Sequence, residues 1–95
     1  MTKMTEIEKL VQEELKEANE IHPQFASDHE AYAVVLEEFE ECEEELAACK
    51  RQLGAIWEQT KNDVNNHALY TYLKQHAIRL VQEAIQLAAM CDKAM

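Results

Sequence analysis

The sequence predicts an all-α protein, with a short N-terminal helix followed by a long antiparallel helical hairpin. The 95 residues include one Gly and one Pro, whereas the strong helix formers Ala, Glu, Leu and Gln are abundant. Apolar residues also recur at spacings of three and four over long stretches. The length corresponds to one domain, residues 1–95, with only a modest core. We therefore expect the hairpin to complete a helical bundle by oligomerisation.

The first helix is expected over residues 5–20. Thr5 and Glu8 have the spacing of a capping box. Pro23 ends the helical pattern, because the residue before a proline avoids the helical conformation. One face of this helix is apolar and consists of Ile7, Leu10, Val11, Leu15 and Ala18.

A long second helix is expected over residues 28–61, where Ser27 and Glu30 form a second capping-box pattern. Gly54 lies inside this helix and costs about 1 kcal/mol relative to Ala. The apolar stripe predicted to face the core is Tyr32, Val35/Leu36, Phe39, Cys42, Leu46, Cys49, Leu53, Ile56 and Thr60.

A turn at residues 61–66 leads into a third helix over residues 66–92. Its stripe reads Leu69, Leu73, His76, Leu80, Glu83, Leu87, Met90 and Ala94. Glu83 thus takes a core position, where a carboxylate is costly unless it is paired or holds a metal. Either Glu83 lies at the edge of the stripe, reaching water or Arg79, or it binds a cation. His76 is either a hydrogen-bonded core or interface histidine or a ligand.

The net charge of −10 is unevenly distributed. Residues 1–49 carry 15 acidic and 3 basic side chains, and residues 50–95 carry 4 acidic and 6 basic ones. This acidity argues against binding a nucleic-acid backbone or an anionic membrane, which both need clustered Lys and Arg. No apolar run approaches the roughly 20 residues that span a bilayer, and no secretory signal opens the chain. We therefore expect a cytoplasmic protein.

The three cysteines, Cys42, Cys49 and Cys91, show no CxxC spacing and fall within helical patterns. An odd number of cysteines in a cytoplasmic chain is typical of reduced, packed thiols. Disulfides or a zinc site are the alternatives. We expect reduced thiols.

Seven of the nine residues from Glu37 to Glu45 are glutamate. Within this run, Glu38, Glu41 and Glu45 share one side of a helix. In a straight antiparallel hairpin, Glu83 lies level with Glu45, or with Glu41 after a shift of one helical turn. Carboxylates that converge between two helices suit a hard divalent cation such as Mg²⁺ or Mn²⁺, and helix bundles build metal sites in this way.

Two segments resemble the MazG-like, all-α nucleotide pyrophosphohydrolases. "LEEFEE" places Glu37, Glu38 and Glu41 in the E-E-x-x-E arrangement of their first metal motif, and "EAIQLAAMCDK", which begins at Glu83, takes the place of their second, E-x-x-D. The stretch "HPQFASDHEAYAVVLEE" before the downstream "EAIQLAAM" is similar to short MazG-like proteins of phages and prophages. The resemblance covers residues 21–46 and 80–92.

The resemblance implies magnesium-dependent cleavage of a nucleoside or deoxynucleoside triphosphate into a monophosphate and pyrophosphate. Its metal ligands would be Glu38, Glu41 and Glu83, and Glu41 is also the candidate catalytic residue. Weaker candidate ligands are Glu37, Glu45 and Gln86. Arg79 is either a contact for a substrate phosphate or an ion-pair partner of Glu83. The expected partners are the nucleotide and further copies of the chain, as a dimer or tetramer.

Two departures from the family pattern favour a second hypothesis. Gln86 stands where the second motif has its aspartate, and the 41 residues between Glu41 and Glu83 make the hairpin longer than is usual. About 20 extra residues in each arm would project roughly 30 Å. The apolar positions on this projection are expected to be exposed in a single chain, which predicts packing against another chain; they are Leu53, Ile56, Trp57, Leu69, Tyr72 and Leu73.

The alternative is a non-catalytic MazG-like helical oligomer, acting as a phage or prophage accessory protein or interaction module. A third reading is a plain coiled-coil adaptor unrelated to the family. Gln86 and the long hairpin favour the non-catalytic oligomer, whereas Glu83 on a core stripe favours the enzyme.

Overall fold

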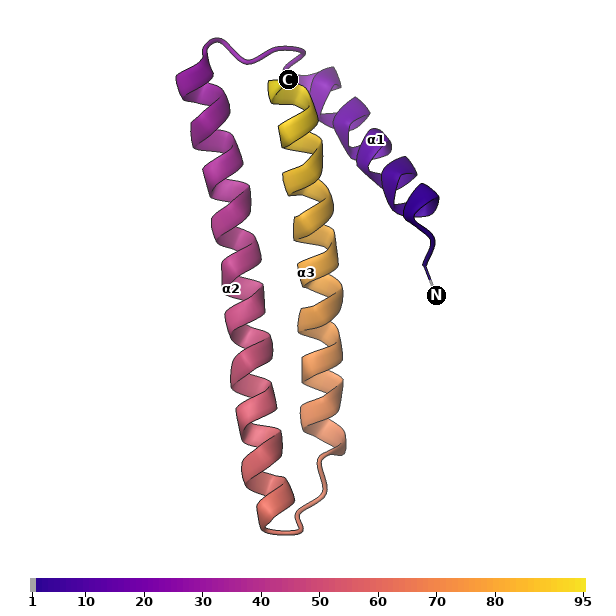
Figure 1. Cartoon of the computed structure of the whole chain (residues 1–95), viewed down its shortest axis with the longest axis vertical. Helices are drawn as coiled ribbons and strands as arrows, with labels where there is room; N and C mark the ends of the chain where they lie inside the picture. Colours follow the sequence, from indigo (N-terminus) through magenta and orange to yellow (C-terminus); the bar gives the residue numbers. More distant parts are fainter. Residues whose placement is uncertain (1) are drawn as a thin grey trace.

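A computed structural model describes residues 2–95 and confirms the all-α fold. The helices are α1 (Met4–Ile21), α2 (Asp28–Lys61) and α3 (His67–Ala94), within two residues of the predicted bounds. Helices α2 and α3 run side by side as a long antiparallel hairpin, and α1 lies against the C-terminal part of α3 (Figure 1). The molecule is elongated, with extents of 54 × 28 × 18 Å. Within the described chain, no helix is both long enough and apolar enough to span a membrane.

The two predicted capping boxes have different outcomes. The Ser27 hydroxyl accepts a hydrogen bond from the Glu30 backbone N–H at 3.1 Å, which caps α2 as expected. The Glu30 carboxylate accepts from the backbone N–H of Ala26, at 3.3 Å, rather than from that of Ser27. The prediction for Thr5 is wrong, because α1 begins one residue before it. Its N-cap is Lys3, which makes no side-chain capping bond within the described chain.

The turn between α2 and α3 is built without glycine. Asp63 adopts a φ of 54°, in the left-handed region that Asp tolerates better than most residues. The backbone N–H of Val64 returns to the Gln59 carbonyl at 2.9 Å, and the Asn66 amide donates to the Thr60 hydroxyl at 2.8 Å. These bonds turn the chain directly from α2 into α3.

The core lies where α1 joins the hairpin. Its buried centre is Val11, Ala89 and Met90, which are 9%, 0% and 8% exposed. Ala89 has a small side chain, so α1 and α3 can approach closely there. Partly buried apolar residues surround this centre; they are Leu15, Ala18, Phe25, Val34, Val35, Ile85 and Ala88.

Enlarging Ala89 is expected to destabilise this junction. Ala89→Leu adds three carbon atoms to a fully enclosed position, and such overpacking costs about 1–3 kcal/mol. Urea unfolding followed by circular dichroism measures the loss. The matched control is Ala68→Leu, an exposed position on the same helix. Equal stabilities for the two variants would contradict the close packing around Ala89.

Helix α2 carries two neighbouring stripes, and the prediction of one core-facing stripe is correct only in part. Of its members, Ile56 is buried and Val35, Cys42 and Cys49 are half-buried, as expected. The side of α2 toward α3 holds small and acidic residues, with Ala31, Ala48 and Ile56 buried and Glu38, Glu41 and Glu45 half-buried. The larger apolar residues Tyr32, Phe39, Leu46 and Leu53 are exposed. Both sides repeat at threes and fours, so periodicity did not distinguish them. Alanine favours the α3 side, because it lets two helices approach.

The expected exposure of the hairpin's far end holds only for some positions. Leu53, Trp57 and Tyr72 are exposed, as predicted. Ile56 is 4% exposed and belongs to the packed side of α2, so its expected exposure was wrong. Leu69 and Leu73 are half-buried.

Candidate metal centre

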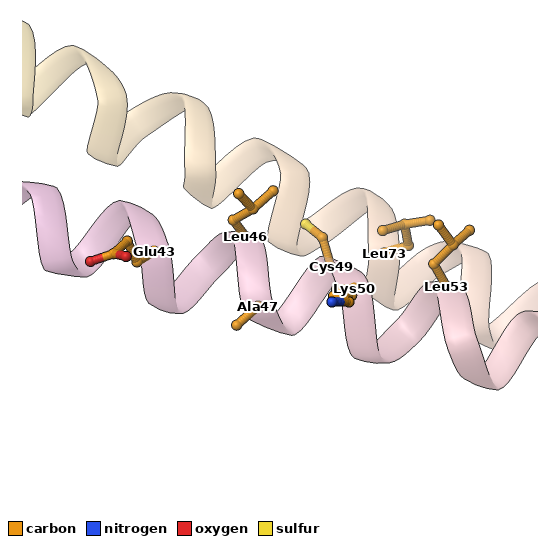
Figure 2. A pocket seen from close by; sticks show the side chains of 7 residues that line it. All are labelled: Glu43, Leu46, Ala47, Cys49, Lys50, Leu53 and Leu73. Atoms are coloured by element: carbon orange, nitrogen blue, oxygen red, sulfur yellow. The ribbon is translucent and has the colours of Figure 1, made fainter.

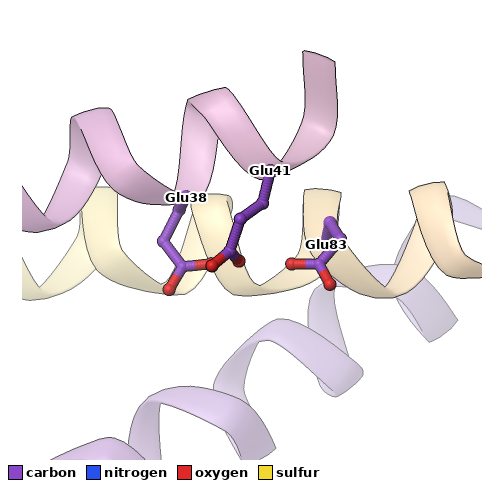
Figure 3. A group of neighbouring side chains, drawn as sticks. All are labelled: Glu38, Glu41 and Glu83. Carbon is purple, nitrogen blue, oxygen red and sulfur yellow. The ribbon is translucent and has the colours of Figure 1, made fainter. Parts of the chain in front are cut away.

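Three carboxylates converge between α2 and α3. Glu38 and Glu41 project from α2 and Glu83 from α3, as Figure 3 shows, and one carboxylate oxygen of each lies within 4.8 Å of the others. Glu38 and Glu41 are three residues apart, so they project from one side of the helix on successive turns. All three side chains are half-buried. The hairpin therefore brings together the three residues proposed as principal ligands, which we call the carboxylate group.

The helix register places Glu83 beside Glu41 and not beside Glu45. Glu45 instead faces His76, with its Oε2 2.8 Å from the histidine Nδ1. A straight hairpin pairing Glu83 with Glu45 is therefore off by one helical turn. His76 is a hydrogen-bonded histidine between the helices, and its partner Glu45 lies outside the carboxylate group.

Gln86 reaches the carboxylate group one turn after Glu83. In the orientation that satisfies its neighbours, its amide nitrogen donates to Glu83 Oε2 at 3.1 Å and to Glu38 Oε2 at 3.3 Å. Gln86 thus lies beside the carboxylate group. It contributes a neutral donor that links the carboxylates of the two helices.

Proton uptake relieves part of the repulsion in the carboxylate group. Burial raises the pKa of Glu38 from 4.5 to about 7, with the charge of Glu41, a hydrogen bond to Glu41 and the charge of Glu83 adding to the effect. The hydrogen bond between Glu83 and Glu41 raises the pKa of Glu83, as does burial. Glu38 is thus partly protonated near neutral pH, and a divalent cation would compete with that proton for the same oxygens.

Cys42, expected to be a packed thiol, is half-buried beside this group. Burial raises the pKa of its thiol, and the negative charges of Glu83, Glu38 and Glu41 raise it further. The thiol is therefore held in its protonated form and is a poor metal ligand and nucleophile. Its place one residue after Glu41 is the sequence signal for this proximity. All three cysteines are free thiols, but Cys91 is exposed, so the expectation of a packed thiol was wrong for this residue.

Two other candidates lie outside the carboxylate group. Glu37 is exposed on α2 and is not among the converging side chains. Arg79 is exposed on α3, and in the described part of the chain it forms no ion pair with Glu83. The ion pair expected as one alternative therefore does not form among the described residues.

The fold and the site define a class: an all-α protein whose long helical hairpin holds an acidic group between its helices. No known family model matches the chain, and comparisons with curated proteins and with solved structures gave no significant match.

Proposed function

We propose that this chain is a magnesium-dependent nucleoside triphosphate pyrophosphohydrolase-like protein, converting an NTP or dNTP into a monophosphate and pyrophosphate. The observation that carries the proposal is the convergence of Glu38, Glu41 and Glu83 from two helices that meet only through tertiary packing. The resemblance of "LEEFEE" and "EAIQLAAMCDK" to MazG-like motifs supplies the reaction class. The proposal also includes a cytoplasmic location.

The donor set fits Mg²⁺, and Mn²⁺ as a substitute, because these ions prefer carboxylate oxygens and keep part of their water shell. Glu38, Glu41 and Glu83 would hold the cation. When bound, it would neutralise charge on the carboxylates and on a substrate phosphate.

Two of the chain's own residues would act on the substrate in this proposal. Glu41 lies within hydrogen-bonding reach of both Glu38 and Glu83, a position from which its carboxylate can orient an attacking water. Arg79 projects from α3 one helical turn before Glu83, and its guanidinium would contact a phosphate oxygen. The base and sugar would rest on apolar surface completed by another copy of the chain, in a dimer or tetramer.

Product analysis tests this proposal directly. The protein is incubated with a panel of ribo- and deoxynucleoside triphosphates in magnesium or manganese, and products are separated by chromatography. The expected result is monophosphate plus pyrophosphate, with Glu41→Gln inactive under the same conditions. Monophosphate release that persists in Glu41→Gln would indicate a contaminating activity. No turnover by folded wild-type protein would reject the enzyme.

The second candidate function, a non-catalytic MazG-like helical oligomer serving as a phage or prophage accessory or interaction module, is favoured by Gln86. Its amide donates to both Glu38 and Glu83, so the two carboxylates gain a partner without any cation. In this proposal the acidic group serves the packing of α2 on α3, and the long hairpin is the functional surface.

Gln86→Glu should show whether the acidic group binds a cation or serves only the packing of α2 on α3. The change keeps side-chain length but replaces a donor with a further carboxylate, so without metal we expect a loss on the order of 1 kcal/mol. Magnesium should then raise the melting temperature more than in wild type, because it gains a ligand. Gln82→Glu, exposed one turn earlier on α3, is the control. Identical magnesium responses in the two variants would argue against a cation at Gln86.

A further inference from the structure

One face of α2 is largely uncovered within the described chain. Its exposed apolar residues are 37–68% exposed and form what we call the outer stripe: Tyr32, Leu36, Phe39, Leu46, Leu53 and Trp57. Glu43 and Lys50 lie on the same face between these residues. With them included, successive positions along the face are separated alternately by four and by three residues. This spacing is the repeat with which one helix packs along another. The outer stripe is therefore patterned for a second helix.

The exposed area of the chain is large enough for such a contact. The chain exposes 7334 Å², whereas a compact monomer of 11.0 kDa exposes about 5,600 Å². The excess is about 1,700 Å² per chain, and a stable interface of standard size buries about 800 Å² per partner. The surplus is thus more than one standard dimer interface requires.

A groove in the middle of the outer stripe shows which charges a partner must carry. It has a volume of about 530 Å³, and Figure 2 shows the side chains that line it: Glu43, Leu46, Ala47, Cys49, Lys50, Leu53 and Leu73. Its walls are apolar except for Glu43 and, two helical turns further along α2, Lys50. A partner helix needs a cation opposite Glu43 and an anion opposite Lys50. An antiparallel copy of α2 carries both.

We propose that a second copy of this chain packs its α2 antiparallel against the outer stripe, about a two-fold axis beside Leu46 and Ala47. This arrangement places Glu43 of each copy level with Lys50 of the other, so symmetry forms the ion pair twice. Leu36 then lies level with the second copy's Trp57. A parallel pair would instead bring Glu43 against Glu43, and the same-sign contact disfavours that register.

The proposed two-fold axis also accounts for the glycine at position 54. In the described chain, a Cβ at this residue would meet no heavy atom within 4 Å, so no packing inside the chain requires a glycine there. Glycine also weakens a helix interior. About the proposed axis, Gly54 lies level with Phe39 of the second copy, and the missing side chain leaves room for the aromatic ring. The inference depends on neither a metal nor a nucleotide.

The mass in solution is the first test. Sedimentation equilibrium should give twice the 11.0 kDa chain mass for wild type. Leu46→Asp places a charge beside the axis in both copies and should weaken the dimer at least 100-fold. Val64→Asp, in the turn at 50% exposure, is the control and should remain dimeric. A wild-type monomer, or a Leu46→Asp protein as dimeric as wild type, would overturn the proposal.

Exchanging the charges tests the antiparallel register and guards against a variant that fails to fold. Glu43→Lys and Lys50→Glu should each weaken the dimer about 10-fold or more, because each creates two like-charge contacts. The double variant Glu43→Lys/Lys50→Glu should recover wild-type affinity, which a misfolded protein would not. Single variants without effect, or a double variant weaker than either single one, would reject this interface.

Discussion

Glu83→Gln is expected to abolish stabilisation of the protein by magnesium. Glu83 is the carboxylate that α3 contributes to the carboxylate group, so its loss leaves Glu38 and Glu41 on a single helix. At a magnesium concentration 100 times the dissociation constant, a single site stabilises the native state by about 2.7 kcal/mol. For a chain of this size that is a rise in melting temperature on the order of 10 °C, which differential scanning calorimetry with and without magnesium measures.

The matched control for this change is Glu40→Gln. It removes the same charge from an exposed position in the same acidic run and should keep the wild-type response. If Glu83→Gln also kept that response, the shared cation site would be rejected. If both variants lost the magnesium-dependent rise in melting temperature, magnesium would be acting through the overall negative charge of α2 rather than by binding at a specific site. In the enzyme proposal, Glu83→Gln should also lower turnover by at least about 100-fold.

The stability of the metal-free protein is expected to fall as the pH rises through neutrality. The pKa of Glu38 is about 7 in the native state and 4.5 as an ordinary carboxyl, so the native state binds this proton more tightly than the unfolded state. The stabilisation is complete below pH 4.5, decreases as the pH rises, and is lost above pH 7. Glu83, with its pKa also raised, contributes with the same sign.

Urea unfolding between pH 4.5 and 8.5 measures this dependence. The slope should stay below the limit of about 1.4 kcal/mol per pH unit for one proton, since solvent screens a half-buried carboxyl. Glu38→Gln should flatten the curve, whereas Glu40→Gln should leave its shape unchanged. Magnesium should stabilise the wild type more at pH 8 than at pH 5, because protons compete for the same oxygens. A wild-type curve no steeper than that of Glu38→Gln would refute the assignment.

The carboxylate group and the outer stripe occupy different sides of α2. Glu38, Glu41 and Glu45 occupy the side toward α3, where apolar residues would normally bury most surface. Much of the large apolar content of α2 therefore lies on its other side, in the outer stripe. The acidic residues inside the hairpin and the apolar outer stripe thus lie on different sides of α2, so the proposals built on them can fail independently.

Local structure was determined by the sequence alone. The bounds of α2, its cap at Ser27 and the placement of Glu38 and Glu41 on one helical side follow from residues only a few positions apart. Capping bonds form within one turn, and the three-and-four repeat is a property of a single helix. The error at Thr5 was of the same local kind, because the helix begins at Met4 and its N-cap is Lys3.

Tertiary packing decided the register of α3 relative to α2. It also decided which side of α2 faces α3. A shift of one turn leaves a three-and-four pattern intact, so the sequence allowed Glu83 beside either Glu45 or Glu41. In the structure Glu83 meets Glu41, His76 takes Glu45, and the Gln86 amide reaches Glu38. The reason is physical: the register depends on how closely Ala31 and Ala48 of α2 let α3 approach and on the geometry of the turn at Asp63. Contacts between distant residues set these features, and no local repeat encodes them.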